Sequence, residues 1–193
     1  MPARERILDA AASVMRERGL GAATTKEIAR AAGYSEATLY KYFDDKQQIF
    51  LSVLKERVPG VEPADALIGT RTVAANLERI VIQLLGFYAQ TFPMAASIFS
   101  APQLLEAQRN GMRARQAGPE GPVRNITAYL EGERSSGRIA PTVDCEAVAR
   151  LLAGACMQQA FFASFDGLDH VPDAAGLATS LVAALGPSLA LTG

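Results

Sequence analysis

The sequence predicts an all-α fold with a small N-terminal domain and a larger helical domain after it. Apolar residues recur at helical spacing through most of the 193 residues, and no segment shows the alternation expected of a strand. Pro59-Gly60 and Pro63 mark a break between helices. We therefore predict an N-terminal domain over residues 1–58 and a C-terminal helical domain over residues 59–193.

The N-terminal domain contains two short predicted helices that are joined by a glycine turn. Thr24-x-x-Glu27 is a capping box, in which each side chain binds the other residue's backbone amide. Gly33 is expected to end the first helix, because only glycine adopts the left-handed conformation without strain.

The second short helix is predicted over Glu36–Tyr42, with Ser35 as its N-cap. Tyr34 and Leu39 are spaced as a hydrophobic staple around this cap. Asp44-x-x-Gln47 predicts the start of a third helix. Two turns of helix cannot bury a core face of their own, which favours a role in recognition.

This order of elements is a helix-turn-helix, whose second helix enters the major groove of DNA and reads base edges with its first residues. Lysine ammonium groups, hydroxyls and free helix amides suit phosphate oxygens. The residues predicted to face DNA are Thr24, Thr25, Tyr34, Ser35, Glu36, Ala37, Thr38, Tyr40, Lys41, Tyr42 and Lys46.

Three of these positions also have a structural interpretation. Tyr34 can serve as the staple alone, and Tyr42 can be half-buried in the core. Glu36 can favour the helix dipole instead of accepting a hydrogen bond from a base.

The string as a whole resembles the N-terminal domain of TetR-type bacterial transcriptional regulators, over about residues 4 to 57. The matching positions are Arg6, Ile7, Leu8, Ala10, Ala11, Gly19, Thr25, Ile28, Ala29, Ala32, Gly33, Ser35, Thr38, Leu39, Tyr40, Phe43 and Lys46. The resemblance implies a homodimer that binds a palindromic operator, usually represses, and is released by a small molecule. Tyr42 stands where many members have histidine, and both can hydrogen-bond a phosphate.

The C-terminal region predicts a long helix over residues 64–91, which Pro93 interrupts, and two final helices over residues 144–165 and 173–191. The last two helices are rich in small residues and apolar on more than one face, which calls for partners on several sides. We expect them to form a four-helix dimer interface; the alternative is a monomeric helical core.

A ligand pocket is a further hypothesis for this region. Its candidate residues are apolar or aromatic, with Arg113 or Gln158 as a polar anchor: Phe87, Tyr88, Phe92, Phe99, Met112, Arg113, Tyr129, Met157, Gln158, Phe161 and Phe162. An apolar cavity with few polar groups favours a small hydrophobic effector. The alternative is that most of these side chains simply fill a core.

Charge and cysteine content set further bounds. The net charge is −1, divided as +2 over residues 1–58 and −3 over residues 59–193. The N-terminus has no apolar run of signal-peptide length, and no stretch has the length of an uninterrupted membrane span, so we expect a cytoplasmic protein without a membrane partner. Cys145 and Cys156 are expected to be buried and reduced.

Nothing in the sequence predicts catalysis, a metal site or a cofactor. The single histidine, His170, has no cysteine or carboxylate at metal-ligand spacing, and no glycine-rich phosphate loop is present. The leading hypothesis is a ligand-responsive repressor. A second keeps DNA binding, but its C-terminal domain only dimerises or binds a protein; a third is a helical enzyme or carrier with an incidental helix-turn-helix.

Overall fold

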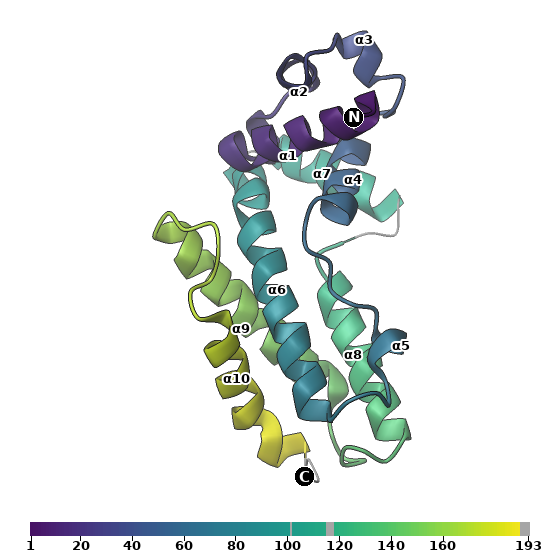
Figure 1. Cartoon of the computed structure of the whole chain (residues 1–193), viewed down its shortest axis with the longest axis vertical. Helices are drawn as coiled ribbons and strands as arrows, with labels where there is room; N and C mark the ends of the chain where they lie inside the picture. The colour runs from purple at the N-terminus through teal and green to yellow at the C-terminus, as the bar shows by residue number, and fades with distance from the viewer. Residues whose placement is uncertain (101, 115–117, 190–193) are drawn as a thin grey trace. The chain divides into compact units, whose positions relative to one another are not determined.

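The computed structural model describes residues 1–100, 102–114 and 118–189, which form helices and turns and no strand (Figure 1). The all-α prediction is confirmed. In chain order the helices are α1 (Ala3–Ala22), α2 (Thr25–Ala32), α3 (Glu36–Leu39), α4 (Lys46–Glu56), α5 (Ala64–Leu67), α6 (Val73–Ala96), the 3-10 helix η1 (Ser97–Ser100), α7 (Pro102–Ala114), α8 (Gly121–Ser135), α9 (Cys145–Phe165) and α10 (Ala174–Leu189).

The chain divides into two compact units. Unit 1 contains Met1–Pro59 and Gln90–Gly118, and unit 2 contains Gly60–Ala89 and Pro119–Gly193. The first break lies next to the predicted domain boundary. The end of α6, η1 and α7 nevertheless pack with the N-terminal helices, whereas the sequence-based division placed them in the second domain.

Unit 1 is organised around α1, which packs against α2, α4 and η1. The apolar faces of α1 and of its neighbours are buried, as expected for amphipathic helices around a single core. The fully buried side chains include Ile7, Leu8, Met15, Ile28, Leu39, Ile49 and Val53.

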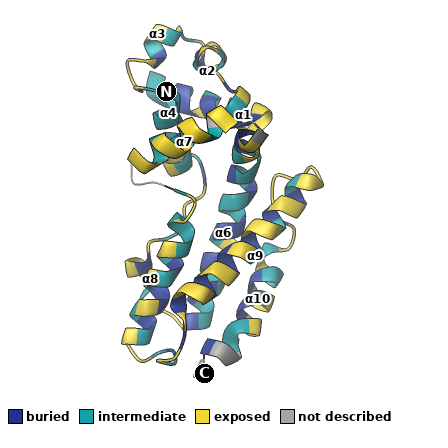
Figure 2. Ribbon diagram, turned by 180° about the vertical axis from the view of Figure 1, so that it is seen from behind, coloured by how far each residue is buried: buried dark blue, intermediate teal, exposed yellow. Residues whose placement is uncertain are grey.

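Unit 2 has its own core between α6, α8, α9 and α10, and the inward faces of these helices are buried (Figure 2). Its largest fully buried side chains are Leu77, Ile80, Leu84, Leu85 and Tyr129. Within this unit, α8 packs against α9 and α5 packs against α8. The predicted end of the last helix at Leu191 lies outside the described residues.

Two helix boundaries differ from the prediction. Pro93 lies inside α6 and does not end it. Proline removes one backbone hydrogen bond, and the helix continues for a further turn where its neighbours hold it. The predicted long helix is also split before Val73, because Gly69 takes a positive φ of 73° after the short α5.

The stretch Val73–Phe99 is long and apolar enough, by length and composition only, to cross a membrane. A core helix of a folded domain passes the same test. The buried positions Leu77, Ile80 and Leu84 belong to the core of unit 2, so the apolar character of α6 has a packing explanation.

Unit 2 also buries a charged residue. Glu133 of α8 has no exposed surface, and its Oε2 lies 2.9 Å from Nη1 of Arg138. Its Oε1 accepts a hydrogen bond of 3.1 Å from the amide of Gly69. The Arg138 guanidinium also binds the carbonyl of Arg71, so this ion pair ties the end of α8 to the turn before α6.

We expect Arg138→Ala to lower the free energy of unfolding by roughly 2–4 kcal/mol, because the buried Glu133 carboxylate would lose its cation; the partial exposure of Arg138 keeps the cost below that of a fully buried pair. Denaturant unfolding measures the change. Arg150→Ala is the matched control: it breaks the exposed Arg150–Glu146 pair within α9 and should leave the free energy of unfolding nearly unchanged. Equal losses in the two variants would contradict this assignment.

Candidate nucleic-acid interface

The first helix of the predicted motif begins with the expected capping box. The amide of Glu27 donates to Oγ1 of Thr24 at 3.1 Å, and the amide of Thr24 donates to Oε2 of Glu27 at 3.2 Å. These contacts with Thr24 hold the pKa of Glu27 below its ordinary value. Gly33 ends the helix in the left-handed conformation, with φ 78°. The start and the end of α2 are therefore defined by the residues that the sequence indicated.

The recognition helix α3 is shorter than predicted. Ser35 caps it by accepting a 3.2 Å hydrogen bond from the amide of Thr38. Beyond Leu39, the amides of Lys41 and Tyr42 bond to carbonyls three residues back, which tightens the chain into turns. The buried Leu39 anchors α3 in the core of unit 1, and the N-terminal end of the helix remains accessible.

The predicted start of the third helix is wrong by one residue. The N-cap is Asp45, whose Oδ1 accepts a 2.7 Å hydrogen bond from the amide of Gln48. Two consecutive aspartates and two consecutive glutamines give the same cap spacing in either register, so the sequence pattern could not distinguish Asp44 from Asp45.

Most residues predicted to face DNA have accessible side chains. Tyr40 and Tyr42 are 50% and 44% exposed although they are large aromatics, so their hydroxyl groups can reach a partner outside the chain. The other exposed members are Thr24, Ser35, Ala37 and Lys41, and the half-buried members are Thr25, Tyr34, Glu36 and Thr38.

Hydrogen bonds connect α2 to α3 at this surface. Oγ1 of Thr25 donates to Oε1 of Glu36 at 2.5 Å and lies 3.4 Å from the Tyr40 hydroxyl. The carboxylate of Glu36 thus has a partner within the chain, and the recognition helix is tied to the first residue of α2.

Tyr34 packs against α1. Its ring lies under the guanidinium of Arg6, with 5.1 Å between the carbon of that group and the ring centroid. This contact adds a cation–π interaction to the staple position.

Lys46 does not extend freely from the surface, as a phosphate contact would require. Its ammonium group donates to the carbonyl oxygens of Leu20 and Ala23, at 2.9 and 3.0 Å, near the end of α1. Partial burial lowers its pKa. Lys46 therefore holds the end of α1 inside unit 1. The sequence could not show that these carbonyls lie within reach of its side chain.

The structure adds two basic residues that the sequence-based set omitted. Lys26 and Arg30 are exposed on α2 and line a hollow of about 560 Å³ with Gly33, Tyr34, Ser35 and Glu36. They are four residues apart and therefore lie on one face of the helix. The spacing of Lys26 and Arg30, on the face opposite the buried Ile28 and Ala29, could have indicated from the sequence that both side chains are exposed.

The grouping of α7 with unit 1 also sharpens the separation of charge. Unit 1 holds 13 Lys/Arg against 9 Asp/Glu, a net charge of +4, and unit 2 holds 6 against 11, a net charge of −5. A positive unit favours contact with a polyanion, and its affinity should decrease with salt.

The predicted ligand residues are divided between the two units. Phe92, Phe99, Met112 and Arg113 belong to unit 1, and the other seven belong to unit 2. Within unit 2, Tyr129 is fully buried and Tyr88 is half-buried. Burial of the Tyr88 hydroxyl raises the pKa of Tyr88 to about 12.

The candidates on α9 have a different environment. Met157, Gln158, Phe161 and Phe162 are exposed on its outer face and do not line the interior of unit 2. A helix with apolar residues on several faces does not reveal from sequence which face is covered.

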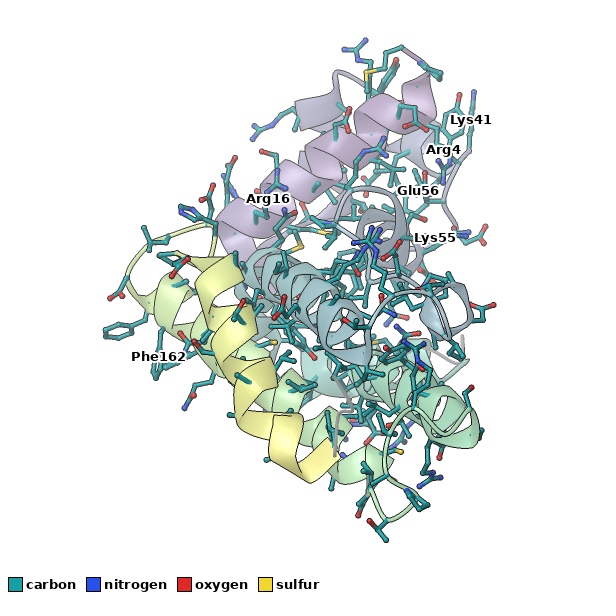
Figure 3. All side chains as sticks on the ribbon, turned by 60° about the horizontal axis from the view of Figure 1, so that its bottom comes forward. Arg4, Arg16, Lys41, Lys55, Glu56 and Phe162 are labelled. Atoms are coloured by element: carbon teal, nitrogen blue, oxygen red, sulfur yellow. The ribbon has the colours of Figure 1, made fainter. Side chains whose placement is uncertain are left out.

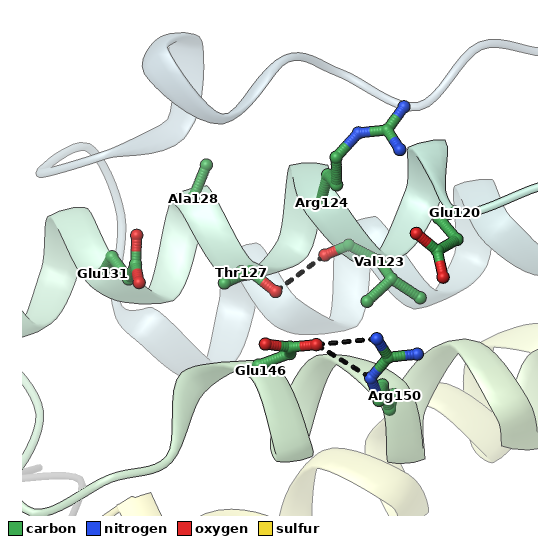
Figure 4. Close-up of a pocket in the computed structure, with 8 residues that line it drawn as sticks. All are labelled: Glu120, Val123, Arg124, Thr127, Ala128, Glu131, Glu146 and Arg150. Carbon is green, nitrogen blue, oxygen red and sulfur yellow. Dashed lines mark hydrogen bonds and ion pairs between the residues drawn. The ribbon is translucent and has the colours of Figure 1, made fainter. Parts of the chain in front are cut away.

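A groove of about 230 Å³ lies between α8 and α9, and it contains none of the predicted ligand residues (Figure 4). Its lining is mixed in charge and mostly exposed: Glu120, Val123, Arg124, Thr127, Ala128, Glu131, Glu146 and Arg150. Arg150 pairs with Glu146 across one turn of α9 at 2.6 Å. Within the described residues, no three His, Cys, Asp or Glu side chains gather as a metal site would require.

The profile described as "Bacterial regulatory proteins, tetR family" matches residues 7–53, which contain α2, α3 and most of α1 and α4. This N-terminal part of the chain is therefore similar to the TetR family. YvkB of Bacillus subtilis, an HTH-type transcriptional regulator, is 44% identical over 55 residues, 28% of this chain and 29% of that protein. A Mycobacterium tuberculosis regulator of the same type is 31% identical over 103 residues, 47% of this chain and 51% of that protein. The chain thus spans about half or less of these relatives.

Solved structures extend the likeness to the whole fold. The fatty acid degradation regulator FadR of Bacillus halodurans has a TM-score of 0.68 at 19% identity, covering 96% of this chain and 95% of that one. FadR of Bacillus subtilis, solved with stearoyl-CoA, has a TM-score of 0.64 at 19% identity, covering 94% and 96%. At these identities the likeness shows the TetR-type helical fold. These relatives are all described as regulators, in agreement with the prediction of a non-enzymatic protein.

We expect the stability of the protein to decrease in acid partly through Glu27. Because its folded pKa is depressed, the carboxylate stabilises the fold above its unfolded pKa of about 4.3, and this contribution is lost as the pH falls through the folded value. Glu27→Gln should therefore lose less stability between about pH 6 and about pH 3 than the unchanged protein. Thermal unfolding over this range measures the difference, and Glu106→Gln, at an exposed acid of α7, should retain the full acid dependence.

Proposed function

We propose that the chain is a transcriptional regulator that binds a palindromic operator as a homodimer and represses until a small hydrophobic effector releases it. The observation that carries the proposal is the α2–α3 surface: capped helix ends, exposed hydroxyls and exposed cations lie around a recognition helix anchored by Leu39. Within TetR-type architecture, this surface is the one suited to a DNA groove.

The contacts divide into two kinds. Lys41, Tyr40 and Tyr42 carry charged or hydroxyl groups on exposed side chains, which suits phosphate oxygens that set the register on the duplex. Ala37 and Thr38 lie in the first turn of α3, where side chains reach base edges. Glu36 is held by Thr25, so we propose that it orients α3 and does not itself read a base.

Dimerisation is supported by the outer face of α9. Leu151, Phe162 and Phe165 are 64%, 47% and 82% exposed, and Figure 3 shows Phe162 projecting away from the ribbon. Monomeric proteins rarely leave several large apolar groups of one helix in water. We propose that a second copy covers this face, with α9 and α10 of each protomer forming the interface, and that the paired recognition helices read two half-sites.

The effector proposal rests on the chemistry of unit 2 and on the relatives. The interior of unit 2 is apolar, with the Tyr88 and Tyr129 hydroxyls among its few polar groups. FadR of Bacillus subtilis was solved with stearoyl-CoA. A long-chain acyl compound is therefore the first class of effector to test, with a cytoplasmic site of action.

The alternative function keeps the DNA-binding dimer without a small molecule. The two cavities described above are open to the surface, and the large apolar side chains of unit 2 are packed into a continuous core. Under this alternative, the C-terminal region only dimerises or binds a protein, and acyl compounds leave operator affinity unchanged.

The DNA-binding proposal is tested by selecting bound sites from random duplexes with the purified full chain, then measuring affinity for the consensus and a scrambled duplex. We expect a palindromic consensus. Lys41→Ala should weaken binding to both duplexes roughly tenfold and reduce the salt slope by about one, because one phosphate contact is lost. Thr38→Ala should weaken binding to the consensus alone.

Lys55→Ala is the matched control, since it removes an exposed lysine of α4 outside the predicted contact set. Binding that shows no sequence preference, or Lys41→Ala behaving like Lys55→Ala, would contradict the proposal.

Dimerisation is tested with Phe162→Glu. A carboxylate in an apolar interface loses its hydration without a partner, so we expect the variant to be a folded monomer. Light scattering after size exclusion measures the mass, and circular dichroism verifies the helix content. Glu131→Gln in the α8–α9 groove is the control and should stay dimeric; a dimeric Phe162→Glu would place the interface elsewhere.

A further inference from the structure

The last turn of α1 is separated from the rest of the helix by a kink at Gly19. This residue has φ 74° and ψ 159°, a backbone conformation reached almost only by glycine. The turn over residues 19–23, which we call the α1 end turn, therefore depends on tertiary partners to satisfy its backbone polar groups.

Those partners come from two later segments of unit 1. Oγ of Ser97, at the start of η1, accepts a 3.0 Å hydrogen bond from the amide of Gly21. In the same turn, the Lys46 ammonium of α4 binds the carbonyls of Leu20 and Ala23. An amide and two carbonyls of the α1 end turn are thus held by side chains that are distant in sequence.

The fit between Ser97 and the turn is close. A Cβ on Gly19 would lie 2.4 Å from Oγ of Ser97 and 2.5 Å from its Cβ. Only a residue without a side chain lets η1 approach the turn so closely. Gly19 therefore serves two purposes, the kink and the contact with Ser97.

The α1 end turn leads directly into the DNA-facing surface. Thr24, the N-cap of α2, follows Ala23, and Thr25 holds Glu36 of α3 through its hydroxyl. A displacement of the turn would therefore move the start of α2 and, through Thr25, the recognition helix. Ser97 directly follows Ala96, the last residue of α6, so the hydrogen bond from Gly21 connects the α1 end turn to the end of α6.

We propose that Ser97 is a positioning residue for DNA recognition, whose hydroxyl holds the α1 end turn so that α2 and α3 keep the geometry of the operator-bound state. This inference rests on the proposed function. Ser97 of η1 would thus contribute to discrimination between DNA sequences, whereas the phosphate-facing residues would provide the affinity for DNA of any sequence. Sequence discrimination, and not total affinity, is the quantity that Ser97 should control.

The test compares Ser97→Ala with unchanged protein on the selected consensus and on a scrambled duplex, at two salt concentrations. Ser97→Ala removes the hydrogen bond from the Gly21 amide and the one that the Ser97 hydroxyl donates to the carbonyl of Met94, within η1 and the end of α6. This loss should weaken consensus binding by about tenfold at most, with less than about twofold on the scrambled duplex and an unchanged salt slope. Ser135→Ala is the matched control, because it removes a hydroxyl that bonds to a helix carbonyl in unit 2. Amide hydrogen exchange of Gly21 should accelerate in Ser97→Ala and not in Ser135→Ala.

Equal losses on both duplexes would overturn the positioning role and indicate general destabilisation, and unchanged consensus binding would overturn it as well. Unprotected exchange of the Gly21 amide in the unchanged protein would show that the contact itself does not form. If the protein without substitutions shows no sequence preference, the proposed function itself is contradicted. The hydrogen-exchange result would then still decide whether Ser97 holds the α1 end turn. If Ser97→Ala fails to fold, Ser97→Thr, which keeps the hydroxyl, should restore Gly21 protection and discrimination together, and failure to restore both would overturn the proposal.

Discussion

The N-terminal surface depends on how the free backbone groups at the ends of very short helices are satisfied. Helices of eight and four residues are not stable in isolation, so α2 and α3 persist only where caps and core contacts hold them. Thr24 with Glu27, Gly33 and Ser35 supply the caps, and Leu39 supplies the buried anchor. The capping residues occupy the rim of the same surface that is proposed to meet DNA.

Fold stability and recognition therefore share residues in this protein. The Thr25–Glu36 hydrogen bond connects the two helices, and the Lys46 ammonium satisfies carbonyls at the end of α1. Such side chains affect DNA binding through geometry as well as through direct contact. Lys41, Tyr40 and Tyr42 have exposed side chains, and they are better placed for direct phosphate contact.

The two units differ in charge and in the way they use apolar surface. Unit 1 is net positive and buries its large aliphatic residues around α1, leaving the tyrosines of the motif exposed. Unit 2 is net negative and leaves aromatic residues of α9 in water. A polyanion is the natural partner of the first surface, and an apolar surface is the natural partner of the second. The proposed operator and second copy follow from this difference.

The sequence by itself determined the all-α class, the capping box at Thr24, the glycine turn at Gly33 and the cap at Ser35, because these depend on neighbours within four residues. It was ambiguous at Asp44–Asp45, where two registers carry the same residue types. Only the tertiary structure decided that Lys46 turns inward, that Pro93 lies within α6, and that Phe161 and Phe162 face outward. It also placed Ser97 against Gly19, 78 residues apart in sequence, since such contacts depend on which helices pack together and leave no periodic signal in the chain.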